Sequence, residues 1–160
     1  MLLYDDHDLI WVAFLKTLHF GAALLEGIPF FVSLIQEGFL EKYETNSDYP
    51  FARSGRVACG LSPAHIEISP GDQFGYISNF DAFGIQRTVR KFSTEPLEII
   101  DTVQDVRMTA PHGMALTNDG SVLFVASQIG EYLYRITTPD FEIESSASVD
   151  PSVPPTGNGT

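Results

Sequence analysis

Histidine and carboxylate side chains recur at a few places in this sequence where they could support catalysis. His65 and Glu67 alternate with Ile66 in the stretch PAHIEI, and His112 lies in the similar stretch PHGMAL. An imidazole can accept a proton near neutral pH, and a carboxylate can act beside it as a second acid or base. We therefore take His65, Glu67 and His112 as the candidate catalytic residues.

Three histidines and two phenylalanines are candidates for binding a ligand: His19, His65, His112, Phe80 and Phe83. The two phenylalanines belong to the loop NFDAFG, where burial of a ring is less assured than in a strand. An exposed aromatic loop could contact a ligand or a protein. The alternative, which we favour, is that both rings fold back on the strands of their own repeat.

A metal centre is not expected among these histidines. His112 directly follows Pro111, whereas His65 comes two residues after Pro63. Because neighbouring residues of a strand point to opposite faces, the two imidazoles should point apart. His19 matches His112 in register, but two ligands rarely make a metal site. The sequence therefore predicts neither a metal nor a cofactor.

Four carboxylates could act with the histidines: Glu67, Asp72, Asp81 and Asp119. Asp72 and Asp119 lie in the turns SPGD and TNDG, where aspartate commonly bonds its own backbone, so a turn role is favoured for both. The sequence contains no GxSxG elbow, phosphate-binding loop, HExxH or CxxCH motif. No pair of carboxylates is spaced in a way that dictates a catalytic mechanism.

The elements that must position these residues form a repeat. PAHIEISPGDQFGYISN (63–79) overlies PHGMALTNDGSVLFVAS (111–127) without a gap, and LHFGAALLEGIPFFVS (18–33) begins a third copy. Asp-Gly between alternating hydrophobic strands is a strong hairpin signal. Each copy continues with two further strands, and four short strands about every 45 residues are typical of a β-propeller blade.

The sequence therefore predicts an all-β fold of about three four-stranded antiparallel β-propeller blades, an incomplete propeller, at 18–58, 63–103 and 110–149. An ordinary antiparallel sandwich is the alternative, but a sandwich has no reason to repeat at a fixed period. Residues 1–17 fit no repeat, and their apolar spacing and acidic start predict a short helical segment. Residues 151–160 hold three prolines and no apolar run, which predicts a disordered tail or a truncated loop.

The pattern P-H-G-x-A-x-T-x-D-G-x-x-L-F-V-A in residues 111–126 resembles the YVTN-type repeat of YncE-like proteins and lactonase-like seven-bladed β-propellers. The first copy departs from it, with Leu18 in place of the proline, and the second inverts the turn to Gly71-Asp72. The resemblance implies a propeller but says little about function, since such folds host unrelated activities. It also makes an envelope or periplasmic location plausible for a longer parent, although no export signal is visible in this chain.

Composition excludes some partners. Nine basic and 21 acidic residues give a net charge of −12, which disfavours binding to nucleic acid or to anionic lipid. Lys16, His19 and Glu26 interrupt the apolar stretch near the N-terminus, so membrane insertion is not expected. The single cysteine, Cys59, is expected to pack as a small apolar residue.

These observations predict a non-catalytic binding or interaction module whose ligand, a protein or a small molecule, is unknown. The alternative is a lactonase-like hydrolase that acts on a sugar lactone at the channel mouth, where the loops entering the innermost strands open. A third option is a propeller partner of a redox enzyme, although no haem, copper or quinone motif supports it. An open row of three blades would also expose blade faces, so self-association through these faces is an expectation.

Overall fold

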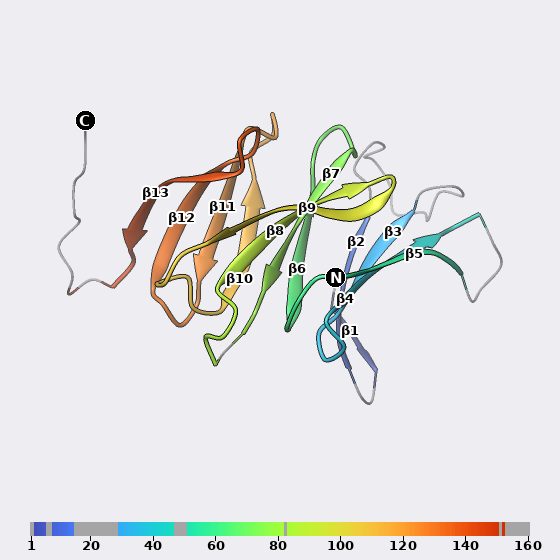
Figure 1. Cartoon of the computed structure of the whole chain (residues 1–160), viewed down its shortest axis with the longest axis horizontal. Helices are drawn as coiled ribbons and strands as arrows, with labels where there is room; N and C mark the ends of the chain where they lie inside the picture. Colours follow the sequence, from blue (N-terminus) through green and yellow to red (C-terminus); the bar gives the residue numbers. More distant parts are fainter. Residues whose placement is uncertain are drawn as a thin grey trace.

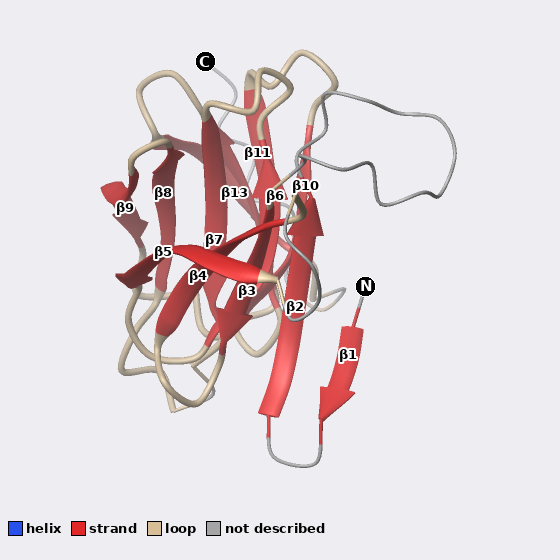
Figure 2. Ribbon diagram, turned by 90° about the vertical axis from the view of Figure 1, so that its right-hand side faces the viewer, coloured by secondary structure: helices blue, strands red, loops and turns tan. Residues whose placement is uncertain are grey.

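In the computed structural model, the described residues form three antiparallel β-sheets that stand side by side (Figure 1). The structure describes residues 2–5, 8–14, 29–46, 51–81, 83–150 and 152, and only the backbone of 2–5 and 8–14. None of the described residues is helical (Figure 2). Accordingly, no helix in this part of the chain is long and apolar enough to cross a membrane.

The strands follow one another in each sheet in chain order. The first sheet contains β1 (Leu2–Asp5), β2 (Asp8–Phe14), β3 (Phe30–Leu34), β4 (Phe39–Glu44) and β5 (Ala52–Ala58). The second contains β6 (Pro63–Ile68), β7 (Phe74–Asn79), β8 (Thr88–Thr94) and β9 (Leu97–Gln104). The third contains β10 (Pro111–Leu116), β11 (Val122–Ser127), β12 (Tyr132–Thr137) and β13 (Glu142–Ser148).

The first sheet shows that the predicted N-terminal helix is wrong. Residues 2–5 and 8–14 are strands that pair antiparallel, from Leu2 opposite Trp11 to Asp5 opposite Asp8. This sheet has five strands, so the prediction of three four-stranded blades is wrong as well. The stretch DLIWVAF is rich in β-branched and aromatic residues, and its backbone pairs with a strand edge that would otherwise stay open. Tertiary pairing thus overrides the helical spacing.

The repeat alignment also misplaced the inner strand of the first sheet. It assigned residues 18–24 to the position beside β3, but β3 is flanked by β2 and β4. Residues 18–24 lie outside the described residues, as do 153–160 of the predicted tail.

The strands β2, β6 and β10 lie next to one another, and β1 lies beyond β2 at the edge of the first sheet. β6 contacts both β2 and β10, and the outer strands β5 and β9 also meet. Figure 2 shows β2, β6 and β10 toward one side of the molecule and β5 and β9 toward the other. Each sheet is therefore an up-and-down meander that runs from an inner to an outer edge, as in a propeller blade.

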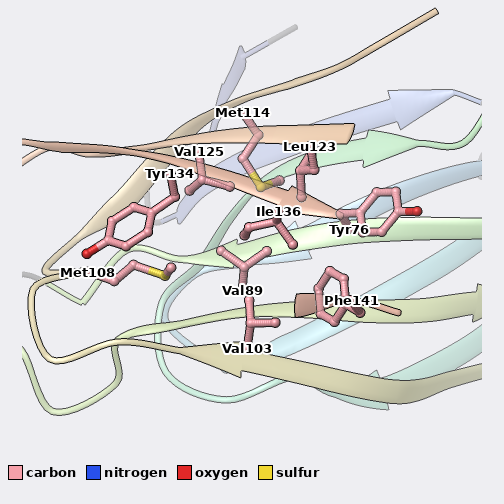
Figure 3. Close-up of a cluster of buried hydrophobic side chains, with 10 residues drawn as sticks. All are labelled: Tyr76, Val89, Val103, Met108, Met114, Leu123, Val125, Tyr134, Ile136 and Phe141. Carbon is pink, nitrogen blue, oxygen red and sulfur yellow. The ribbon is translucent and has the colours of Figure 1, made fainter. Parts of the chain in front are cut away.

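Two apolar clusters fill the spaces between neighbouring sheets. The cluster between the second and third sheets (Figure 3) comprises Tyr76, Val89, Val103, Met108, Met114, Leu123, Val125, Tyr134, Ile136 and Phe141. The cluster between the first and second sheets comprises Phe31, Leu40, Cys59, Ile66, Ile68, Ile77 and Phe92. Cys59 is fully buried as expected, and burial raises the pKa of its thiol to about 12. The buried core of each sheet is thus formed by packing against the neighbouring sheets.

Candidate functional site

The candidate residues lie on the two innermost strands that the structure describes in full, β6 and β10. Both strands carry a β-bulge at the same place, between Pro63 and Ile66 in β6 and between Pro111 and Met114 in β10. His65 lies within the first bulge and His112 within the second. Bulges re-aim side chains and recur next to functional sites.

His65 and Glu67 form a pair on one face of β6. The Nε2 atom of His65 lies 3.4 Å from Oε1 of Glu67, and the two side chains are 24% and 18% exposed. The Nδ1 atom accepts a hydrogen bond of 3.4 Å from the backbone N–H of Met114 on β10. In neutral His65 the proton is therefore on Nε2, the nitrogen that faces Glu67.

His112 lies in a partly buried position across from this pair. Its ring meets the ring of Phe80 edge-on, with 5.0 Å between the centroids. Burial lowers the pKa of His112 below the ordinary value of 6.5, and the charge of His65 lowers it further. His112 is thus held neutral, the state in which an imidazole can accept a proton.

The expectation that the imidazoles of His65 and His112 point apart is therefore wrong. Ile66 and Ile68 on β6 pack toward the first sheet, so His65 and Glu67, which alternate with them, face the third sheet. Met114 belongs to the core between the second and third sheets. Side chains on the two faces of one strand point apart. A side chain on the face of one blade and a side chain on the adjoining face of the next blade, however, point into the same space between the blades.

Ser78 on β7 fixes the backbone of both histidines. Its Oγ donates to the carbonyl oxygen of His112 at 3.3 Å and accepts the N–H of His65 at 3.2 Å. Ser33 on β3 donates in the same way to the carbonyl oxygen of Ala64 at 2.9 Å. These hydroxyl groups link neighbouring blades by hydrogen bonds and hold the backbone of the site in place along the innermost strands.

The two aromatic residues of the loop after β7, which are candidates for ligand binding, differ in how far they are exposed. Phe80 packs edge-on against His112 of the third sheet, whereas Phe83 is 91% exposed, so the expectation that both rings fold back on their own sheet is wrong for Phe83. Asp81 shapes the loop because its carboxylate accepts the N–H groups of Phe83 and Gln86. Beside the loop lies a cavity of about 530 Å³ lined by Gly84, Ile85, Arg87, Gln104, Asp105 and Val106, a set that excludes both site histidines.

The other carboxylates do not join the histidines. The carboxylate of Asp119 accepts hydrogen bonds from Thr117 and Ser121 within its own turn, which lower its pKa to about 2. Asp72 occupies the corresponding turn with a positive φ of 56°. Glu67 is thus the one of the four candidate carboxylates that lies against a site histidine.

Imidazole and carboxylate groups are common metal ligands. Within the part of the chain that the structure describes, however, no group of three or more histidine, cysteine or carboxylate residues is placed to hold a metal ion. His19, the third predicted ligand-binding histidine, lies outside the described residues.

Solved structures share this arrangement of sheets at low sequence identity. Hydrazine synthase of Kuenenia stuttgartiensis is 18% identical with a TM-score of 0.66, over 76% of this chain and 33% of that one. The periplasmic gluconolactonase PpgL of Pseudomonas aeruginosa is 14% identical with a TM-score of 0.63, over 74% of this chain and 35% of that one. A putative 6-phosphogluconolactonase of Bacteroides fragilis is 15% identical with a TM-score of 0.63, over 76% and 36%.

The chain has a β-propeller fold. It spans about a third of the length of these structural neighbours. No protein-family model matches the sequence, and no curated protein matches it. The structural neighbours support a propeller, but the predicted fold class is wrong in its N-terminal helix and its strand count.

Sequence reasoning missed the contributions of Ser78 and of Phe80 against His112. The repeat did carry a signal for Ser78, since Ser33 occupies the same position in the first copy, whereas the third copy has Ala126 there. A hydroxyl recurring in an otherwise apolar strand points to a buried partner that needs a hydrogen bond. The contact of Phe80 depends on the loop path and has no such signal.

Proposed function

We propose that this chain carries the acid–base groups of a lactonase-like β-propeller that opens a sugar lactone by hydrolysis. The observation that carries the proposal is the convergence of His65, Glu67 and His112 on the facing sides of two innermost strands. Two of the structural neighbours bear the names of gluconolactone or phosphogluconolactone hydrolases, and they favour this function over the binding module expected first.

In the proposed reaction, His112 acts as the general base. Its neutral imidazole takes a proton from a water molecule as the water oxygen attacks the lactone carbonyl carbon, forming a tetrahedral oxyanion. The bond between that carbon and the ring oxygen then breaks, and the imidazolium returns the proton to the leaving ring oxygen. The product is the open hydroxy acid, so one water is consumed and no oxidant or reductant is needed.

His65 and Glu67 act as positioning residues in this proposal. Glu67 holds Nε2 of His65, and the Met114 N–H holds Nδ1, so the ring cannot turn freely. Burial lowers the pKa of His112 and the charge of His65 lowers it further, so protonation of His112 before substrate arrives is disfavoured. The ring of Phe80 packs edge-on against the ring of His112 and helps to hold it in place.

The test is the rate of opening of glucono-δ-lactone, followed as acid release with the spontaneous rate subtracted. His112→Gln should lower the catalysed rate by about 100-fold, the order that general base catalysis contributes. Glu67→Gln should lower the catalysed rate less, because Glu67 acts as a positioning residue. The control is Glu98→Gln, which changes an exposed carboxylate on the outer strand β9 and should leave the rate unchanged. Full activity of His112→Gln would overturn the proposal.

The finer resemblance to YVTN-type repeats of YncE-like proteins is also part of this proposal. It is supported by the Pro-His-Gly start of β10 and the Asn-Asp-Gly turn that follows it. The matching position in β6 keeps the proline and the bulge.

A further inference from the structure

Each sheet carries a cation at the same position of the strand before its outer edge, on β4, β8 and β12. Lys42 pairs across its sheet with Phe31, Lys91 with Tyr76 and Arg135 with Phe124, and each cation directly precedes a β-bulge. Lys42 and Lys91 point toward the following blade, where they are 8% and 9% exposed. Arg135 pairs with Glu144 of its own blade.

The two lysines meet the next blade at equivalent turns but find different partners there. The Nζ atom of Lys42 lies 2.5 Å from the carboxylate of Glu95, the first residue after β8. The residue in the same place after β12 is Thr138, and both turns continue with proline. Lys91 donates instead to the carbonyl oxygen of Thr138 at 2.8 Å.

Lys91 is therefore a buried ammonium group. The interface between the first and second sheets supplies a carboxylate at the equivalent place, but the interface that buries Lys91 does not. Its Nζ also lies 4.8 Å from the centre of the Phe74 ring, but among the described residues it makes no ion pair. A buried charge is costly unless it is paired. One carbonyl oxygen leaves further donors of this ammonium available.

A cavity of about 260 Å³ adjoins Lys91 between the second and third sheets. Its lining includes Phe74, Tyr76, Thr138 and, at the rim, Asp119. It lies by the turns that follow β6, β10 and β12, whereas the site histidines lie where β6 and β10 begin. The aromatic rings suit a ligand with a carbon skeleton, and the carboxylate of Asp119 disfavours a multiply charged anion such as phosphate.

We propose that this cavity binds a small monocarboxylate, whose carboxylate takes the place beside Lys91 that Glu95 takes beside Lys42. The ligand's carbon atoms would contact the rings of Phe74 and Tyr76. This site is separate from the proposed lactone site and does not depend on it.

The probe is propionate, which reproduces the end of a glutamate side chain, and its neutral isostere propionamide is the ligand control. Saturation-transfer NMR should show saturable binding of propionate in the millimolar range and none of propionamide. Thr138→Glu supplies the missing carboxylate from the protein, and Lys91→Met removes the cation. Each should weaken propionate binding at least tenfold.

Thr137→Glu is the matched control, because it places the same charge one residue away on the opposite face of β12. It should leave propionate binding unchanged. Thr138→Glu gives up the hydrogen bond from the Thr138 hydroxyl to the carbonyl oxygen of Gly120, and a thermal unfolding midpoint close to that of the wild type would show that the variant folds. Absence of saturable propionate binding, or equal binding by the wild type and both site variants, would overturn the proposal.

Discussion

The surroundings of His112 lower its pKa, and this shift makes the stability of the folded chain depend on pH. Its pKa is lowered from 6.5 in the folded chain, so below pH 6.5 the unfolded chain binds the proton more readily than the folded chain does. The contribution of His112 is therefore complete above pH 6.5 and is lost as the pH falls toward the folded value. Urea unfolding from pH 8 to pH 5 should show this loss.

The variant His112→Gln isolates this effect from the titration of carboxylates. The difference in unfolding free energy between wild type and variant should shrink as the pH falls below 6.5. A difference that stays constant over that range would mean that His112 titrates alike in the folded and unfolded chains.

Ser78 offers a second test at the scale of single residues. Ser78→Ala removes one hydroxyl that bonds the backbone of both histidines and leaves the His112 carbonyl without this donor. The cost should be about 1–3 kcal/mol of unfolding free energy, the usual cost of leaving a buried polar group unsatisfied. Thermal or urea unfolding measures it. Ser93→Ala, on a partly exposed part of β8, is the comparison and should cost less.

At the scale of elements, close packing between β7 and β8 requires a glycine. A Cβ atom on Gly75 would lie 2.1 Å from Cζ of the fully buried Phe92, far inside contact distance. Gly75→Ala should therefore destabilise the second sheet by about 1–3 kcal/mol, as overpacking does. Gly71→Ala, where a Cβ would meet nothing within 4 Å, is the matched control and should be close to neutral. Equal unfolding midpoints for the two variants would contradict this packing.

The elements also show what sequence could predict. Periodicity and the Asp-Gly turn located the second and third sheets because each of their strands lies beside its chain neighbour. The N-terminal segment was misread, since its partner β3 is distant in sequence and pairing decided its conformation. The facing of His65 and His112 was missed because strand alternation was applied within one sheet, whereas the two residues belong to neighbouring sheets.

For the whole molecule, the outer face of the third sheet has the pattern of a blade interface. Phe124, Leu133 and Arg135 occupy the positions that Tyr76, Val89 and Lys91 occupy in the second sheet. Val89 is fully buried by the third sheet, while Leu133 is 41% exposed. We propose that this face mediates self-association of the chain.

Light scattering tests the association. The wild-type chain should show a concentration-dependent increase in mass, and Leu133→Lys should abolish it by placing a charge in the apolar face. The control is Glu98→Lys, an exposed position on β9 of the second sheet, which should associate as the wild type does. A mass that is independent of concentration in the wild type would contradict self-association.

Catalysis by His112 is tested most directly by the pH profile of glucono-δ-lactone opening by the wild-type chain. General base catalysis by His112 predicts a rate above the spontaneous one and a fall on the acid side with a midpoint below pH 6.5, which disappears in His112→Gln. A rate equal to the spontaneous rate at every pH, or an acid limb that is unchanged in the variant, would contradict catalysis by the facing histidines.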